Sequence, residues 1–193
     1  MDGRARTTRT DGSGVHGREP VETTEAQGSA QAARLSHDDL WAFCLQYYSV
    51  REVKDACLSM QNRYGGNVNL LLLVRWLDEQ RLTFDEQGWA TLHASLARCE
   101  PLLHSYRELR RKLKLGAPDT LYREALQFEL ELEKQQQIDL LTGVNTLTLQ
   151  DNQGEPLTLH YCRQQGAEPL YAALHTEWYP NVDNPPKTEA SKG

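Results

Sequence analysis

The chain has 193 residues, a formal net charge of −6 and a sequence pI near 5.5. This charge argues against a dedicated nucleic-acid binder, which usually carries a basic excess, so DNA is not expected as a partner. No apolar run reaches the roughly 18 residues of a membrane span, and no hydrophobic signal core begins the chain. We therefore expect a cytoplasmic protein without a membrane segment.

Abundant Leu, Ala, Glu, Gln and Arg, set against few β-branched residues, predict an all-α protein. Residues 1–35 contain almost no large apolar side chains and cannot offset their ordering entropy, so we predict a disordered tail. Residues 179–193 form a second predicted disordered tail. Between them, residues 36–178 are predicted to form a single-domain helical bundle of about six or seven helices.

The first helices are marked by capping signals. Ser36 and Asp39 form a capping-box-like pair at the start of the first one. A second start signal follows at Ser49, with Glu52 three residues later. This second helix is predicted to end at Gly65, because glycine suits the left-handed position after a helix.

The next predicted helix begins after Asn67 and runs to about Gln80. Its apolar side chains cover most of the circumference and leave only a narrow polar strip of Arg75, Asp78 and Glu79. A helix this hydrophobic is buried on several sides, so we expect it to be the central helix of the bundle.

Thr83 and Glu86 mark a further helix start, and one apolar seam continues from there past Pro101. Proline in such a seam must kink the helix or divide it into two abutted helices. The seam ends in a cluster of cations: Arg107, Arg110, Arg111, Lys112 and Lys114.

A helix predicted from residue 118 to about residue 141 follows the basic cluster. Its apolar stripe is Leu121, Ala125, Phe128 and Leu132, and its outer face is acidic from Glu124 to Glu133. A basic helix end followed by an acidic antiparallel helix predicts ion pairs across a helical hairpin, although exposed pairs of this kind contribute little.

Residues 144–161 permit two interpretations. Leucines alternate on both sides of Asn152-Gln153-Gly154, which is typical of a short β-hairpin. Pro156 could equally stand at the first turn of a helix. A last short helix is predicted from Glu168 to about Trp178.

No catalytic motif is present in the sequence, which favours a protein that is not an enzyme and assigns no catalytic residue, cofactor or metal. The cysteines are far apart, and most fall at apolar helical positions, so we expect buried, reduced thiols: Cys44, Cys57, Cys99 and Cys162.

The segment 61–73 contains the candidate site. Asn69 shares an arc with core leucines, and a buried amide without partners costs about 1–3 kcal/mol. Two interpretations stay open: Asn69 ties a neighbouring helix in place, or it lines a pocket. The candidate ligand-binding residues are Asn62, Arg63, Tyr64, Asn67, Asn69 and Trp76.

The corner Gln61-Asn62-Arg63-Tyr64-Gly65-Gly66-Asn67-Val68-Asn69-Leu70-Leu71-Leu72-Leu73, with the preceding run that begins at Trp41, resembles a family of uncharacterised bacterial proteins. This family is a domain of unknown function found mainly in proteobacteria such as pseudomonads, and the resemblance covers roughly residues 38–141. It implies a small helical cytoplasmic protein and implies no activity.

The function we expect from the sequence is a non-enzymatic module for protein–protein interaction. The alternative is a small-molecule-binding protein or enzyme with a pocket beside the helix 67–80. A weaker alternative is contact with RNA or a phosphorylated ligand through the basic cluster, whose plainer interpretation is a solvated helix end.

Overall fold

A computed structural model describes residues 34–175 of the chain, and the predicted tails of residues 1–35 and 179–193 lie almost wholly outside this range. Only Arg34 and Leu35 of the first predicted tail are described. Leu35 exchanges two hydrogen bonds with Asn145, one through its N–H and one through its carbonyl, each at 3.0 Å. The contacts of the helical part thus begin one residue before Ser36.

The expected all-α class is confirmed: the described residues contain eight α-helices, a 3-10 turn and one pair of two-residue strands. In chain order these are α1 (His37–Tyr47), α2 (Arg51–Arg63), α3 (Val68–Glu79), β1 (Leu82–Thr83), α4 (Glu86–Leu96), α5 (Glu100–Leu113), α6 (Asp119–Val144), β2 (Gln150–Asp151), α7 (Leu157–Gln164), η1 (Glu168–Leu170) and α8 (Tyr171–Leu174).

Two predicted helix starts and the predicted end at Gly65 match the structure. The Ser36 hydroxyl accepts a hydrogen bond from the Asp39 N–H at 3.2 Å, and Asn67 caps α3 by accepting from the Leu70 N–H at 3.0 Å. Gly65 has φ +68° directly after α2, a conformation that glycine adopts at low cost. These signals are local, so the sequence reveals them.

Two other predicted caps are wrong. Val50, not Ser49, precedes α2, because the Ser49 hydroxyl turns back to donate to the Gln46 carbonyl at the end of α1. Thr83 lies in β1, and the cap of α4 is Asp85, whose carboxylate accepts from the Gly88 N–H.

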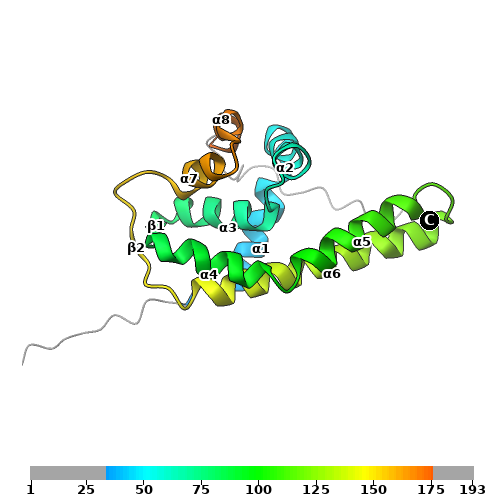
Figure 1. The fold of residues 1–193 in the computed structure, drawn as a ribbon, viewed down its shortest axis with the longest axis horizontal. Helices are drawn as coiled ribbons and strands as arrows, with labels where there is room; N and C mark the ends of the chain where they lie inside the picture. Colours follow the sequence, from blue (N-terminus) through cyan, green and yellow to red (C-terminus); the bar gives the residue numbers. More distant parts are fainter. Residues whose placement is uncertain (1–33, 176–193) are drawn as a thin grey trace, which may run out of the picture. The chain divides into compact units, whose positions relative to one another are not determined.

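α3 is the central helix, as predicted. It packs against α1, α2, α6, α7 and β1, and Figure 1 shows it between α7 and α6. Every residue from Asn69 to Leu77 is buried. This continuous burial explains why the sequence of α3 is apolar around almost its whole circumference.

Arg75 and Asp78 of the polar strip of α3 bind other helices, whereas Glu79 is exposed. Arg75 is only 4 % exposed, donates to the Leu174 carbonyl at 3.0 Å and pairs with Glu79. Asp78 accepts hydrogen bonds from the backbone N–H groups of Leu157 and Thr158, at 2.7 and 2.9 Å. The strip thus fastens α7 and α8 onto the central helix.

The β-hairpin and the helix predicted as alternatives for residues 144–161 are each partly correct. Residues 150–151 form β2, but their antiparallel partner is β1, at residues 82–83. The residues that would have returned as the second strand of a local hairpin instead form α7, with Pro156 immediately before it. The Asn152-Gln153-Gly154 turn is present, with the Gly154 N–H bonded to the Asn152 side chain at 2.9 Å.

The seam at Pro101 is divided into two abutted helices, α4 and α5, with Pro101 in the first turn of α5. α5 packs antiparallel to the first half of α6, and Figure 1 shows this pair extending beyond α2 and α3. The predicted stripe of α6 is only partly buried: Ala125 is buried, whereas Leu121 and Phe128 are exposed. α5 covers that flank of α6 only in part, through Tyr106 against Phe128.

Candidate functional site

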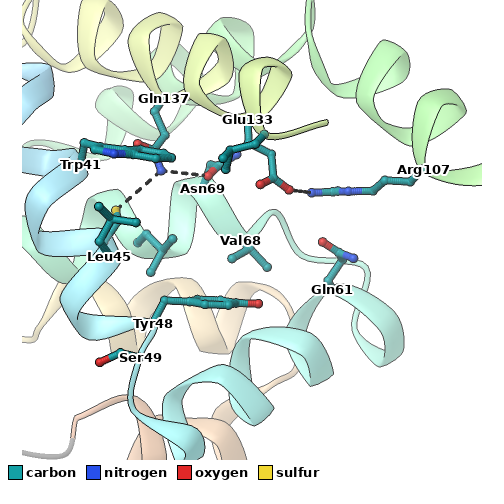
Figure 2. Close-up of a pocket in the computed structure, with 13 residues that line it drawn as sticks. Trp41, Leu45, Tyr48, Ser49, Gln61, Val68, Asn69, Arg107, Glu133 and Gln137 are labelled. Atoms are coloured by element: carbon teal, nitrogen blue, oxygen red, sulfur yellow. Dashed lines mark hydrogen bonds and ion pairs between the residues drawn. The ribbon is translucent and has the colours of Figure 1, made fainter. Parts of the chain in front are cut away.

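A cavity of about 370 Å³ lies beside the central helix, against the side of α3 that carries Asn69. Its wall comes from α1 and the turn after it, α2, α3, α5 and α6 (Figure 2). We call it the amide pocket. Its volume lies in the lower part of the range found for small-molecule sites.

The apolar wall of the amide pocket is formed by residues that the hydrophobic pattern places on the inner sides of the helices. Figure 2 shows the Trp41 and Tyr48 rings on opposite sides of the space in front of Val68. The apolar lining is Trp41, Cys44, Leu45, Tyr48, Val68, Leu72 and Leu130.

The polar wall consists mainly of amides and one ion pair. The Arg107 guanidinium donates to the Glu133 carboxylate at 2.7 Å, and Figure 2 places this pair at one side of the pocket. The other polar lining residues are Ser49, Gln61, Asn69 and Gln137.

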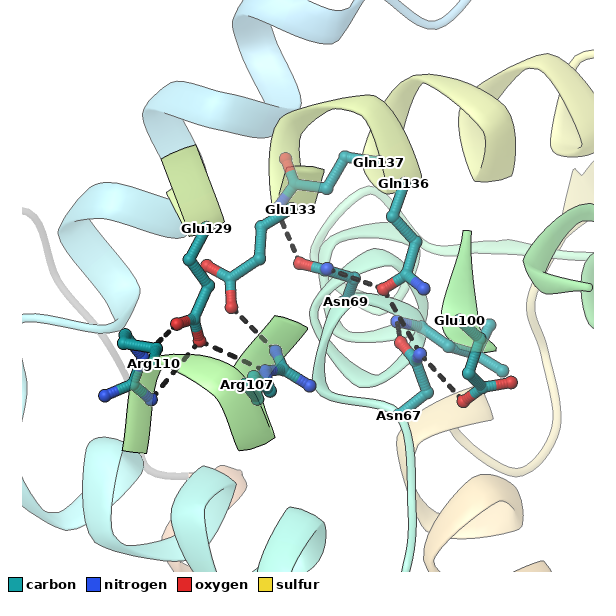
Figure 3. A network of polar contacts seen from close by, with 10 residues as sticks. Asn67, Asn69, Glu100, Arg107, Arg110, Glu129, Glu133, Gln136 and Gln137 are labelled. Carbon is teal, nitrogen blue, oxygen red and sulfur yellow. Dashed lines mark hydrogen bonds and ion pairs between the residues drawn. The ribbon is translucent and has the colours of Figure 1, made fainter. Parts of the chain in front are cut away.

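Asn69 ties α3 to α6 and also lines the pocket, so both interpretations of this residue hold. Its side chain is 6 % exposed. Its Nδ2 donates to Gln136 Oε1 at 2.8 Å, and its Oδ1 accepts from Gln137 Nε2 at 3.1 Å (Figure 3). An amide with both of its polar atoms bonded bears little of the desolvation cost of burial.

Four side-chain amides are linked by hydrogen bonds, and the helix cap at Asn67 fixes the orientation of each. They belong to Asn67, Gln136, Asn69 and Gln137. Because Asn67 Oδ1 caps α3, its Nδ2 faces Gln136 Oε1 at 3.2 Å and Glu100 Oε1 at 3.1 Å. Gln136 Oε1 can only accept, so it also accepts a hydrogen bond from Asn69 Nδ2. Asn69 Oδ1 then accepts a hydrogen bond from Gln137 Nε2.

This orientation leaves two buried polar atoms without a partner in the described structure: Gln136 Nε2 and Gln137 Oε1. Gln136 is 1 % exposed and Gln137 2 %. Gln137 lines the amide pocket, and Gln136 lines an adjoining cavity of about 270 Å³ that shares Gln61 and Arg107 with it. Buried groups of this kind are uncommon in native proteins, and each calls for a specific explanation.

Burial also keeps the Cys44 thiol and the Tyr48 hydroxyl of the pocket protonated. It raises the pKa of the Cys44 thiol to about 12, although the hydrogen bond from Gln137 acts in the opposite direction. Burial likewise raises the pKa of the Tyr48 hydroxyl to about 12, and the nearby Glu133 carboxylate adds to this rise. Neither group carries a charge at neutral pH.

The predicted ion pairs between the basic cluster and the acidic helix are present. Arg107 and Arg110 both pair with Glu129, and Arg107 also pairs with Glu133 (Figure 3). The remaining cations, Arg111, Lys112 and Lys114, form no ion pair with a described residue. The cluster is therefore partly neutralised by α6.

The candidate residues predicted from the sequence do not gather in one place. Asn69 lines the amide pocket and Asn67 the adjoining cavity. Asn62 and Arg63 are exposed at the end of α2, where the Arg63 guanidinium lies 5.9 Å from the Tyr64 ring centre. Trp76 is buried in α3 and lines neither cavity.

Sequence reasoning missed the most informative partners of Asn69. Gln136 and Gln137 stand in a run of glutamines on a helix whose acidic residues suggest a solvent-exposed surface. The buried amide at Asn69 was a signal that partners exist, but their position depends on how α6 crosses α3.

No group of three or more His, Cys, Asp or Glu side chains among residues 34–175 could hold a metal ion. All four cysteines are free and buried, as expected. In the same residues, no helix has both the length and the apolar character needed to cross a bilayer.

Fold and pocket together define an all-α domain with a ligand-sized, amide-walled cavity beside its central helix. The chain belongs to the family described as "Protein of unknown function (DUF2390)", whose model matches residues 39–140. This range includes every residue that lines the amide pocket. No curated protein and no solved structure matches the chain.

Proposed function

We propose that the protein binds a small molecule in the amide pocket without catalysing a reaction. The observation that carries this proposal is a 370 Å³ cavity whose wall includes the Gln61 amide and the Tyr48 hydroxyl, neither of which forms a side-chain hydrogen bond with a described residue. The second supporting feature is the mixed wall, in which apolar and aromatic side chains surround a few fixed polar groups. This composition is typical of small-molecule sites.

The indole N–H signals of the tryptophans test this proposal in a library screen by ¹H–¹⁵N NMR. Trp41 lines the pocket, whereas Trp89 is buried under α7, stacked on His160. We expect library compounds that bind to shift the Trp41 signal and to leave the Trp89 signal in place. A library that shifts neither signal, or both equally, would contradict the proposal.

A blocking variant at the rim gives a second readout. Leu45 lines the pocket but is 58 % exposed, so Leu45→Trp should fill the entrance without disturbing the core. Leu58→Trp, at an exposed position outside the pocket, is the matched control. A ligand present at about 100 times its Kd should stabilise wild type and the control by about 2.7 kcal/mol and should not stabilise Leu45→Trp.

A second candidate function is supported by a different surface, which we call the hairpin face: Leu102, Tyr106 and Leu109 of α5 with Leu121 and Phe128 of α6. Spacings of three, four and seven residues align these side chains along each helix. The Tyr106 and Phe128 rings, 5.0 Å apart, join the two rows. Leu102, Leu109 and Phe128 are each at least half exposed.

We infer that the hairpin face would receive an amphipathic helix of a protein partner. Two antiparallel helices with an apolar row between them offer a groove for a third helix. Glu124 and Glu131, both exposed, lie one helical row beyond Leu121 and Phe128. The partner helix would therefore carry basic residues along one border.

A photo-crosslinking amino acid at position 109 tests this interaction in cells of the native host. The same amino acid at Gln127, which is exposed outside the hairpin face, is the control. We expect adducts with another polypeptide at position 109 only. Equal adducts at both positions, or none at position 109, would count against the interaction.

A further inference from the structure

The chemical class of the ligand follows from the charge of the pocket wall. Arg107 and Glu133 neutralise each other at 2.7 Å, and Cys44 and Tyr48 remain protonated at neutral pH. The other polar lining groups are amides and one hydroxyl. A charged ligand would lose its water without gaining a counter-ion, which costs far more than desolvating a neutral molecule.

The shape of the wall favours a flat molecule. Trp41 and Tyr48 face the pocket from opposite sides, with Val68 of α3 behind the space between them (Figure 2). Aromatic walls of this kind stack on a planar ring and gain free energy beyond the burial of apolar area. An aliphatic chain would fill the same space without that gain.

The hydrogen-bonding capacity of the wall includes both donors and acceptors. Gln137 Oε1 also lacks a partner, but it has almost no accessible surface and cannot meet a ligand in this conformation. The Gln61 amide and the Tyr48 hydroxyl line the pocket and form no side-chain hydrogen bond with a described residue. A ligand can therefore offer an N–H donor and a carbonyl acceptor to the Gln61 amide, and either group to the Tyr48 hydroxyl.

Building on the proposed small-molecule function, we propose that the ligand is an uncharged planar ring compound with an N–H donor beside a carbonyl acceptor. Aromatic carboxamides and nucleobases share this chemistry. The ring lies between Trp41 and Tyr48, and the polar edge meets the Gln61 amide.

Benzamide, benzoate and benzamidine test this class because they have nearly the same shape and differ mainly in charge. We measure their dissociation constants from the shift of the Trp41 indole signal. Benzamide should bind wild type with a Kd on the order of 1 mM, as expected for so small a probe. Benzoate and benzamidine should each bind at least about tenfold more weakly, because the neutral wall offers no counter-ion.

Glu133→Gln separates the charge argument from simple shape selection. It removes one negative charge from the wall and leaves Arg107 with Glu129 as its remaining partner. The ratio of benzoate to benzamidine affinity should rise at least about threefold in this variant, because the wall gains net positive charge. Glu124→Gln, at an exposed position of the same helix outside the pocket, should leave the ratio unchanged.

The outcomes distinguish the two proposals. Tighter binding of benzoate or benzamidine than of benzamide, or an unchanged ratio in Glu133→Gln, overturns the uncharged class and leaves small-molecule binding standing. The uncharged class is also overturned, and small-molecule binding stands, if none of the three probes binds while another library compound shifts the Trp41 signal. If no compound of any charge shifts that signal, the proposed function itself is overturned.

Discussion

Gln137 shows how one residue acquires its role from contacts far away in the chain. Asn67 caps α3, its amide orients Gln136, and Asn69 passes the same constraint to Gln137. The unpartnered acceptor of Gln137, buried beside the pocket, is thus a consequence of a helix cap at residue 67. The fold itself therefore sets which atoms of these amides donate and which accept.

Replacing Asn69 tests the structural side of this amide chain. Asn69→Leu keeps the size of the side chain but removes one hydrogen bond from each of Gln136 and Gln137, so we expect a loss of about 1–3 kcal/mol of unfolding free energy. Urea unfolding measures it. Asn62→Leu, at an exposed position without a hydrogen bond, should change stability by less than about 0.5 kcal/mol. Equal effects would show that the amide chain contributes nothing.

The Cys44 thiol predicts a pH dependence. Its pKa rises from 9.0 to about 12 on burial, so the folded protein holds this proton more tightly than the unfolded chain. The resulting stability is complete below pH 9.0 and is lost as pH rises towards about 12, by up to about 1.4 kcal/mol per pH unit. The unfolding free energy of wild type should therefore fall more steeply above pH 9.0 than that of Cys44→Ala. Parallel curves would contradict the shift.

At the scale of elements, the polar end of α3 determines where the last helices dock. Burial raises the pKa of the Asp78 carboxyl, while the N–H groups of Leu157 and Thr158 act in the opposite direction. The carboxylate stands at the start of α7, where a helix favours negative charge. α7 thus has its cap on another helix rather than in its own sequence.

Asp78→Ala should release the start of α7. We expect a cost of about 1–2 kcal/mol, as for the loss of a helix cap, with faster amide hydrogen exchange concentrated in α7. Asp38→Ala is the matched control, because Asp38 lies exposed in the first turn of α1 and caps no other helix. Faster exchange throughout the protein, rather than in α7, would point to a general loss of stability.

The crossing of α4 and α6 depends on Gly143. A methyl group there would overlap the Ser95 hydroxyl and approach Leu92, so Gly143→Ala should cost about 1–3 kcal/mol despite the higher helix propensity of alanine. Gly116, after α5, has open space around it. Gly116→Ala should therefore be nearly neutral in the same thermal or urea unfolding experiment.

Elements with local signals were predictable, and elements fixed by distant partners were not. Ser36, Gly65 and Asn67 carry their signals within a few residues, and the structure agrees at each. The pairing of β1 with β2 joins residues 82–83 to 150–151, and no short pattern encodes it. The amide pocket also depends on distant partners. Asn69 was a candidate from the sequence, but Gln137 was not.

At the scale of the whole molecule, the family match and the fold do not end together. The match stops at residue 140, yet α7 and α8 pack against α3 and α2 and complete the burial of the central helix. The sequence beyond residue 140 is therefore part of the same hydrophobic core in the described structure.

Truncation tests the contribution of these last helices. A chain that ends at residue 148 lacks β2, α7 and α8 and leaves Arg75 without its Leu174 partner. We expect its unfolding free energy to fall by at least about 3 kcal/mol, because several core leucines regain contact with water. A chain that ends at residue 178 lacks only the tail predicted to be disordered and should match wild type. Equal stability of the two truncated chains would contradict this account.

The position of α3 has a consequence for synthesis on the ribosome. α3 ends at residue 79, and α7, which covers one of its sides, begins at residue 157. At about 5–20 residues per second, translation of the intervening segment takes about 4–16 s. During that time the side of α3 that packs against α7 has no partner, although α1 and α2 have already been made. We therefore expect this side of α3 to be covered only after residue 157 and the rest of α7 have been made.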